Sequence, residues 1–312
     1  MSFLVCGEAL IDLIKQQDSS WIAHNGGGPM NTAKALAQLE LPTQFLGRIS
    51  KDNFGQNLLT ELISYDVGVK HVIAAPEPTS LAVVEVDSSG AASYSFYLNE
   101  TSNFNWQLNE LPTDVSMYQA IHIGTLALVI PPGDAVLFDW LKNLKNAPMV
   151  MIDLNVRPSV ISDKTHYSEK LAPWIAQANI LKVSEDDLEF LYPNQGWQEV
   201  AQQLLTTFKL SLIAVTLGSG GAALVTPKII VFENAPAVQV VDTVGAGDTF
   251  SAGLLFKLYE YGALDHQTLE MLSNEDLQDS LHFAVNAAAL SCTKAGAVPP
   301  TRAEVEAFIN VS

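Results

Sequence analysis

The sequence has few basic residues and lacks the basic stripe that nucleic-acid-binding proteins carry. Lysine and arginine together number 16 against 34 aspartates and glutamates, which gives a formal net charge of −18 at pH 7. A field of this sign repels a phosphate backbone, so we expect no nucleic-acid partner. Small phosphorylated ligands are not excluded, because local backbone amides can hold them.

Cysteines, signal-peptide features and long apolar runs are also scarce. Cys6 and Cys292 stand at opposite ends of the sequence and form neither a disulfide framework nor a CxxC metal site, which favours a reducing compartment. The first residues have no basic stretch and include Glu8 and Asp12, unlike a signal peptide. No run of about 18 apolar residues occurs, so we predict no membrane-spanning helix. These absences favour a soluble, cytoplasmic protein.

Several common catalytic motifs are missing as well. There is no GxxxxGK(S/T), which excludes a P-loop enzyme, and no HExxH. The six histidines show no metal-ligand spacing. There is no GxSxG nucleophile turn, because Leu217 stands two residues before Ser219.

Short apolar strands alternate with amphipathic helices along most of the chain, which predicts a mainly parallel sheet flanked by helices on both faces. Period-two patterns around Ser88-Ser89-Gly90 predict a β-hairpin, and a second antiparallel piece is expected over residues 221–236. We therefore expect one α/β domain over residues 1–312 with a small β insertion. The predicted strands are residues 3–6, 44–49, 81–87, 91–98, 149–154, 180–183 and 212–217, and the predicted helices are 29–39, 53–65, 184–191, 200–208, 250–261 and 277–294.

The strongest local motif is Gly245-Ala246-Gly247-Asp248, which joins an apolar strand to a helix. Small residues let a backbone approach an anion, and the free N–H groups of a first helical turn point toward it. An adjacent carboxylate suits phosphoryl transfer to an alcohol. The alternative is a tight turn with a helix-favouring acid, and the helix dipole would make Asp248 a weak base in either case.

Two N-terminal features suit a sugar. Asn31 follows three glycines, Gly26-Gly27-Gly28, at the start of a predicted helix and offers both a donor and an acceptor to vicinal hydroxyls. Asp12 follows the first strand, at the edge where open α/β sheets bind ligands. The alternatives are a flexible loop and a surface acid.

Two further strands end in polar groups. Arg157 could clamp a phosphate or carboxylate, or could pair with Asp153 as a structural bridge. Ser184-x-x-Asp187 has the form of a helix capping box, and a metal-bound water held by Asp187 or Glu185 is the alternative.

The stretch Gly218-Ser219-Gly220-Gly221-Ala222-Ala223 satisfies GxGxxA. A dinucleotide site needs a helix after this motif, whereas residues 223–226 are predicted to be extended, so we reject a nicotinamide site. A loop beneath a nucleotide phosphate remains open.

Together these stretches resemble the ribokinase-type (PfkB-type) carbohydrate kinases from residue 7 to about 296. Asp242-Thr243-Val244-Gly245-Ala246-Gly247-Asp248 is similar to the C-terminal signature DTxGAGD. Gly26-Gly27-Gly28-x-x-Asn31, followed by Gly47-Arg48-Ile49-x-x-Asp52-x-Phe54-Gly55, is similar to the N-terminal one. The resemblance implies a ribokinase-like α/β fold whose β-sheet lid lies at about residues 12–24 and 78–102 and often forms a homodimer.

The resemblance also implies roles for individual residues, with ATP, Mg²⁺ and in some members K⁺ as partners. One departure is that the N-x-x-E motif associated with Mg²⁺ stands here as Ser184-x-x-Asp187. The implied residues are Asp248 as catalytic base with the amides of Gly245, Ala246 and Gly247 as anion hole; Asp12, Gly27, Gly28, Asn31 and Arg157 for the sugar; Lys182, Ser184, Thr216, Gly218, Ser219, Gly221 and Asn286 for the nucleotide; Asp187 for Mg²⁺; and Asp242 and Val244 for a monovalent cation.

Within the family, the stretches Gly7–Asp12, Asp153-x-Asn155-x-Arg157 and Lys182-x-Ser184 look most like bacterial fructokinases. This resemblance implies ATP-dependent phosphorylation of the primary hydroxyl of D-fructose. The alternatives are a 2-keto-3-deoxygluconate kinase or another sugar kinase, and, in a different class, a sugar-binding regulator without turnover.

Overall fold

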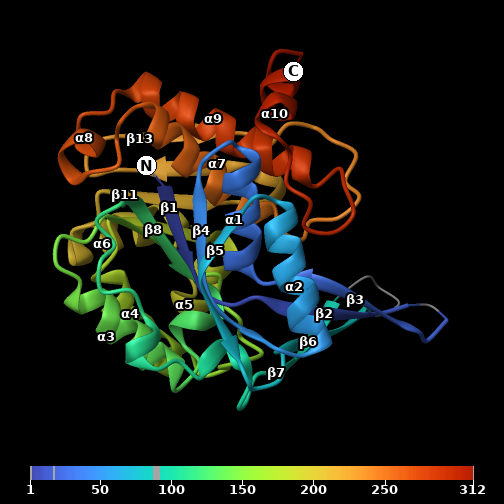
Figure 1. Cartoon of the computed structure of the whole chain (residues 1–312). Coiled ribbons are helices and arrows are strands. Elements are labelled where there is room, and N and C mark those ends of the chain that lie inside the picture. The colour runs from blue at the N-terminus through green and yellow to red at the C-terminus, as the bar shows by residue number, and fades with distance from the viewer. Residues whose placement is uncertain (1, 17, 87–91, 312) are drawn as a thin grey trace.

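A nine-stranded, mostly parallel sheet forms the centre of the computed structural model, which describes residues 2–16, 18–86 and 92–311 (Figure 1). Its strands follow the order β13-β12-β11-β10-β9-β8-β1-β4-β5. All neighbours from β11 to β5 pair in parallel, whereas β12 and β13 are antiparallel. The bounds are β1 (Ser2–Cys6), β4 (Thr43–Ser50), β5 (Gly68–Ala75), β8 (Tyr118–Gly124), β9 (Met149–Asp153), β10 (Ile180–Ser184), β11 (Leu212–Thr216), β12 (Ala222–Val225) and β13 (Ile230–Glu233).

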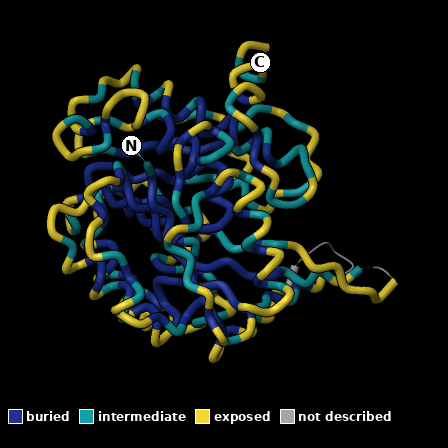
Figure 2. The backbone as a smooth tube through the Cα atoms, in the orientation of Figure 1, coloured by how far each residue is buried: buried dark blue, intermediate teal, exposed yellow. Residues whose placement is uncertain are grey.

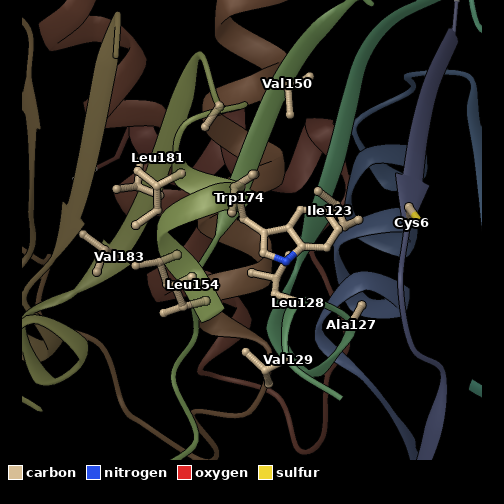
Figure 3. Close-up of a cluster of buried hydrophobic side chains, with 14 of the residues drawn as sticks. Cys6, Ile123, Ala127, Leu128, Val129, Val150, Leu154, Trp174, Leu181 and Val183 are labelled. Atoms are coloured by element: carbon tan, nitrogen blue, oxygen red, sulfur yellow. The ribbon is translucent and has the colours of Figure 1, made fainter. Parts of the chain in front are cut away.

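Helices cover both faces of this sheet. Successive residues of β1 alternate between two buried clusters, Phe3 and Val5 in one, Leu4 and Cys6 in the other, as expected for a strand buried on both sides. Trp174 packs among sheet residues of one face (Figure 3), and most of the sheet is coloured dark blue, as buried, in Figure 2. The first face carries α3 (Gly133–Asn143), α4 (Lys164–Ile175), α5 (Glu185–Leu191) and α6 (Trp197–Phe208); the second carries α1 (Gly28–Gln38), α2 (Asn53–Ser64), α7 (Ala246–Glu260), α8 (His266–Glu270), α9 (Asn274–Ser291) and α10 (Arg302–Ile309).

A second, four-stranded sheet projects from this body (Figure 1). It has the order β3-β2-β6-β7 and consists of β2 (Leu10–Lys15), β3 (Trp21–Gly26), β6 (Leu81–Val86) and β7 (Ala92–Tyr97). Most of β3 is exposed (Figure 2), with Trp21 43% exposed, and Tyr97 at the end of β7 is 61% exposed. We call this four-stranded sheet the small sheet. The turn predicted at Ser88-Ser89-Gly90 lies outside the described residues.

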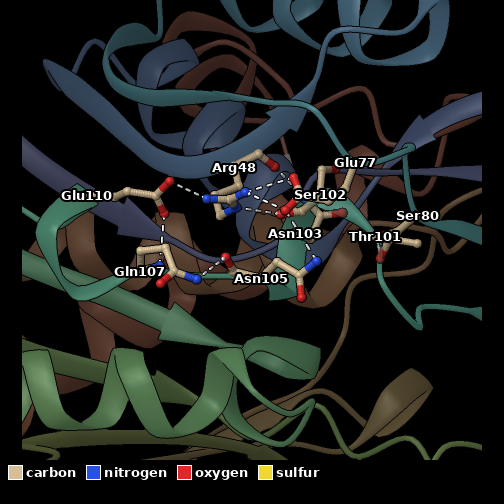
Figure 4. Close-up of polar contacts among 9 residues, drawn as sticks. All are labelled: Arg48, Glu77, Ser80, Thr101, Ser102, Asn103, Asn105, Gln107 and Glu110. Carbon is tan, nitrogen blue, oxygen red and sulfur yellow. Dashed lines mark hydrogen bonds and ion pairs between the residues drawn. The ribbon is translucent and has the colours of Figure 1, made fainter.

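Arg48, at the end of β4, anchors the chain on either side of the small sheet (Figure 4). Its buried guanidinium donates to Glu77 at 2.8 and 2.9 Å, to the Ser102 carbonyl at 3.0 Å, and to Glu110. Asn103 in turn donates to the Arg48 carbonyl at 2.9 Å. The segments entering and leaving the small sheet are therefore fixed to the same strand of the large one.

The α/β prediction is confirmed, including the antiparallel piece at β12 and β13. Both cysteines are free. Some boundaries were wrong. The helix predicted at 250–261 begins at Ala246, and Asp12 lies inside β2 rather than beyond β1. Sequence patterns also missed β8, whose buried run includes the polar His122, and α4, which contains Pro173. Within the described ranges, no helix is long and apolar enough to cross a membrane.

Candidate active site

Residues from four distant segments meet where the parallel strands end. The start of α1 approaches the start of α7 and the residues that follow β8 and β9. A Cβ placed on Gly28 would lie 2.8 Å from Thr125 Cγ2, 3.1 Å from Asp248 Oδ1 and 3.4 Å from Asn155 Nδ2. Ligands in open α/β sheets bind at this edge, so the arrangement marks a candidate active site.

Asp248 is the central acid of this site. It lies in the first turn of α7, is 8% exposed, and accepts a hydrogen bond from Asn31 Nδ2 at 3.0 Å. Burial raises the pKa of Asp248, although Asn31, Lys182 and Arg157 oppose the shift. Burial thus shifts the pKa of Asp248 in the direction opposite to that expected from its place at a helix start.

The turn before Asp248 is built on two crowded glycines. Gly245 has a φ of 80°, and a Cβ there would lie 2.9 Å from the Ala297 Cβ. A Cβ on Gly247 would lie 3.0 Å from Lys182 Nζ, so the ammonium sits directly against the turn. The Ala246 N–H donates to the Thr243 carbonyl at 3.2 Å, whereas the amides of Gly247 and Asp248 have no partner among the residues described. Free amides beside an ammonium form an environment suited to an anion.

Lys182 is held by a buried ion pair. Its Nζ lies 3.0 Å from Asp153 Oδ2, and the two side chains are 5% and 1% exposed. Burial raises the pKa of Asp153 to about 6, against the opposing charge of Lys182. The alternative bridge between Asp153 and Arg157 is wrong, because the β9–β10 register sets Asp153 opposite Lys182 while Arg157 Nη1 donates to the carbonyls of Asn155 and Val156.

Polar groups gather beside Asp248 around Gly26–Gly28 and Asp12, and we call them the polar cluster. A Cβ on Gly26 would lie 2.1 Å from Asp12 Oδ2, so only glycine leaves this carboxylate in place. Burial raises the pKa of Asp12 to about 6, with Arg157 opposing and Asp248 adding to the shift. Asn31 Oδ1 is buried and has no hydrogen-bond partner in the described part of the chain. Carboxylate and amide acceptors around glycine backbone fit a ligand rich in hydroxyls.

Sequence reasoning missed Glu8 and Thr125 as parts of this site. Thr125 has a φ of 60°, which is strained for a β-branched residue. Buried Glu8 accepts hydrogen bonds from the Thr125 hydroxyl and from the Ala127 N–H, the latter at 3.3 Å, and burial raises its pKa to about 8. Thr125 follows β8, the strand that the patterns did not reveal, so no local signal pointed to the pair.

The Gly245–Gly247 turn also lines a pocket of about 800 Å³. Its walls come from the ends of β10 and β11, from residues 235–247 and from α9. Gly221, with a φ of 102°, makes the turn into β12, which confirms that a strand rather than a helix follows the GxGxxA motif. Seven predicted residues line the pocket, namely Ser184, Thr216, Gly218, Ser219, Gly221, Ala246 and Gly247.

Two predicted nucleotide residues lie outside that lining. Lys182 is buried beneath the turn, as described above. Asn286 is buried on α9 and donates to the His282 carbonyl at 2.7 Å, while its neighbours Val285 and Ala289 line the pocket.

The two acids predicted to bind metals are occupied by backbone amides. Asp187 accepts from the N–H groups of Val156 at 2.8 Å and Ser184 at 2.9 Å, and the Ser184 hydroxyl accepts from the Asp187 N–H, which confirms the capping box. Asp242 accepts from Val244 N–H at 3.0 Å and Gly296 N–H at 2.9 Å. Across the described residues there is no group of three or more side chains that could hold a metal ion. The metal roles therefore stay predictions.

Comparison with known proteins agrees with this geometry. Residues 2–304 match the model of the "pfkB family carbohydrate kinase". The chain is 30% identical over 280 residues to a fructokinase of Rhizobium leguminosarum bv. trifolii, covering 88% of this chain and 85% of that protein. It is 30% identical to a fructokinase of Klebsiella pneumoniae over 94% of each.

Solved structures of fructokinases are also similar. The fructokinase of Xylella fastidiosa with bound ATP superposes with a TM-score of 0.91 at 27% identity, covering 99% of this chain and 98% of that one. A double mutant of the Vibrio cholerae O395 fructokinase, bound to fructose, ADP and potassium ion, has a TM-score of 0.85 at 28% identity with the same coverage.

Proposed function

Because this chain belongs to the pfkB family of carbohydrate kinases, we propose that it is a fructokinase that transfers the γ-phosphoryl group of ATP to the 6-hydroxyl of D-fructose. The observation that carries the proposal is the place of Asp248. This buried carboxylate, hydrogen-bonded by Asn31, lies beside the polar cluster, and the turn that precedes it lines the 800 Å³ pocket. An acceptor alcohol held by the polar cluster would approach a phosphate held in the pocket.

In the proposed reaction, Asp248 orients the sugar hydroxyl and accepts its proton. The hydroxyl oxygen bonds to the γ-phosphorus while the bond from phosphorus to the leaving ADP oxygen breaks. Asp12, Asn31 and the backbone at Gly27–Gly28 bind the sugar hydroxyls, with Arg157 at the rim. The raised pKa makes the Asp248 carboxylate better able to accept the proton of the sugar hydroxyl, while the hydrogen bond from Asn31 fixes the orientation of that carboxylate.

Charge on the transferring phosphoryl group is stabilised by the Gly245–Gly247 turn and by Lys182 beneath it. Backbone amides and an ammonium already in place need no reorganisation during the reaction. Ser184, Thr216 and the loop of Gly218, Ser219 and Gly221 bind the nucleotide, with Asn286 supporting the adenine wall from within α9.

Bound Mg²⁺ would neutralise charge on the nucleotide phosphates, and the part of the chain that the structure describes holds no group of three or more His, Cys, Asp or Glu side chains to ligate it. Since both Asp187 oxygens accept backbone hydrogen bonds, Asp187 would act on the ion through water. A monovalent cation such as K⁺ would take carbonyl oxygens near Asp242 and Val244, where the Asp242 side chain joins two loops.

We propose further that the small sheet is a lid within a single domain and that two chains associate through it in the cytoplasm. The exposed aromatic residues Trp21, Tyr94 and Tyr97 support this, because water-exposed aromatic area of this kind is typical of interfaces. Light scattering on the native chain and on Trp21→Ser tests it. We expect a dimer that the substitution weakens, and a wild-type monomer would contradict the proposal.

A coupled assay of ADP release tests the function. It is run with ATP and Mg²⁺, with and without K⁺, on fructose, 2-keto-3-deoxygluconate and ribose. We expect turnover on fructose and a loss of at least about 10³-fold in kcat for Asp248→Asn, with ADP binding retained. Asp139→Asn on α3, exposed and equal in charge change, is the control. Turnover on 2-keto-3-deoxygluconate alone would replace the sugar and make Arg157 the carboxylate clamp, and ATP binding without any turnover would favour a regulator.

A further inference from the structure

A buried lysine that the proposed reaction does not use joins helix α1 to the far side of the active site. Lys34 lies three residues after Asn31, on the same face of α1, and is 1% exposed. Its Nζ donates to Glu61 Oε1 on α2 at 2.7 Å and to the Ala297 carbonyl at 3.0 Å. The ammonium also lies 5.3 Å from the centre of the Tyr65 ring.

Ala297 belongs to a loop, residues 292–298, that supports the Gly245–Gly247 turn from behind. The closeness of the Ala297 Cβ is what leaves no room for a side chain at Gly245. The same loop is tied to the segment that precedes the turn, because Gly296 N–H donates to Asp242 and the Cys292 carbonyl accepts from the Asp242 N–H at 3.2 Å. A shift of this loop would therefore be transmitted to the first residue of the turn.

Glu61 extends the connection to the small sheet. Besides Lys34, its carboxylate accepts a hydrogen bond from Asn25 in β3. A continuous set of contacts thus runs from Asn25 through Glu61 and Lys34 to Ala297 and Gly245. An ammonium is costly to bury, and an apolar side chain of similar size would pack there at a lower cost. The lysine is therefore explained by the two hydrogen bonds through which it joins Glu61 to Ala297.

We propose that Lys34 is a positioning residue that fixes the 292–298 loop against Gly245 and so keeps the turn in place for phosphoryl transfer. The inference rests on the proposed function for its kinetic consequence, whereas its structural consequence holds whichever sugar is the substrate. A loosened turn would misplace amides that act on the transferring group. The hydrogen bonds of Lys34 reach Glu61 and Ala297, whereas most of the nucleotide pocket is formed by other segments. We therefore expect a larger effect on kcat than on ADP binding.

The test uses two variants of the full chain. Lys34→Met removes the tether but leaves Glu61 without its cation, so it also lowers the melting temperature. Lys34→Met/Glu61→Gln removes both charges, which restores most of the melting temperature without restoring the tether. We expect kcat to stay at least tenfold below wild type in both, with Kd for ADP and KM for fructose within threefold. The control is Lys170→Met, which breaks a partly buried ion pair with Asp134 on the opposite face.

Hydrogen exchange separates this inference from the proposed function. Amides of residues 292–298 and 243–248 should exchange at least tenfold faster in the double variant than in wild type and be unchanged in Lys170→Met. Unchanged exchange there would overturn the inference even for an inactive wild type. A double variant with wild-type kcat would overturn it as well, since the lysine would then contribute only to stability.

Discussion

Gly28→Ala tests the place of the sugar most directly. Gly28 is the first residue of α1 and does not have a left-handed φ, so alanine suits its backbone and favours the helix by about 1 kcal/mol. The added methyl, however, would lie 2.8 Å from Thr125 Cγ2 and 3.1 Å from Asp248 Oδ1. The substitution therefore leaves the fold intact and fills the space where the sugar hydroxyl must meet the carboxylate.

The size of the effect follows from how little Thr125 can move. Carbon atoms prefer separations of about 3.5–4.0 Å, so the methyl must displace its neighbours by about 1 Å. Thr125 cannot rotate away without breaking its hydrogen bond to buried Glu8. A misplacement of about 1 Å in a reacting site costs on the order of 10²-fold in rate, or about 2.7 kcal/mol. We expect kcat/KM for fructose to fall by roughly this factor.

Steady-state ADP release measures this effect, with KM for ATP expected to stay within about threefold because the nucleotide pocket lies beyond the turn. Gly196→Ala, before α6, is the matched control, since a Cβ there meets only Gln198 Oε1 at 3.5 Å. If Gly28→Ala keeps kcat/KM within threefold of wild type, the sugar does not lie against Gly28.

Three other predictions follow from buried charge and crowded backbone. Because burial raises the pKa of Asp12 to about 6, kcat/KM for the sugar should fall tenfold for each pH unit below pH 6. A pH profile in which kcat/KM begins to fall only below pH 5 would contradict this. Burial raises the pKa of Glu8 from 4.5 to about 8, so the folded state holds its proton longer than the unfolded one. The free energy of unfolding should thus fall by up to about 1.4 kcal/mol per unit as pH rises from about 4.5 to 8. Denaturant titrations should show this loss relative to Glu8→Gln, and parallel pH curves for the two proteins would refute it. Gly221→Ala would set a Cβ 2.0 Å from the Glu233 carbonyl at a φ of 102°, and should lower the free energy of unfolding by at least about 2 kcal/mol; a change under about 0.5 kcal/mol would show that the β11–β12 turn adapts.

Features that depend on neighbours in the chain were predictable. The alternation of apolar strands with amphipathic helices indicated the α/β sheet, and Ser184-x-x-Asp187 indicated the capping box that the structure contains. The extended character of residues after Gly221 excluded a dinucleotide site, as β12 shows. Each of these rests on backbone propensity or hydrogen bonds within a few residues, which a sequence displays directly.

Features that depend on which segments pack together could not be predicted from the sequence. Parallel register, rather than spacing along the chain, pairs Asp153 with Lys182 instead of Arg157. Burial among four segments raises the pKa of Asp248, whereas its sequence position at a helix start suggested the opposite.

The sequence by itself determined the type of fold and the family signatures, and it proposed most residues of the candidate site, because these follow from local patterns. Only the tertiary structure decided what surrounds them: Glu8 beneath Thr125, and Lys34 between Glu61 and Ala297. A charged side chain has the same identity on the surface and in the core, and its environment is set by segments tens or hundreds of residues away.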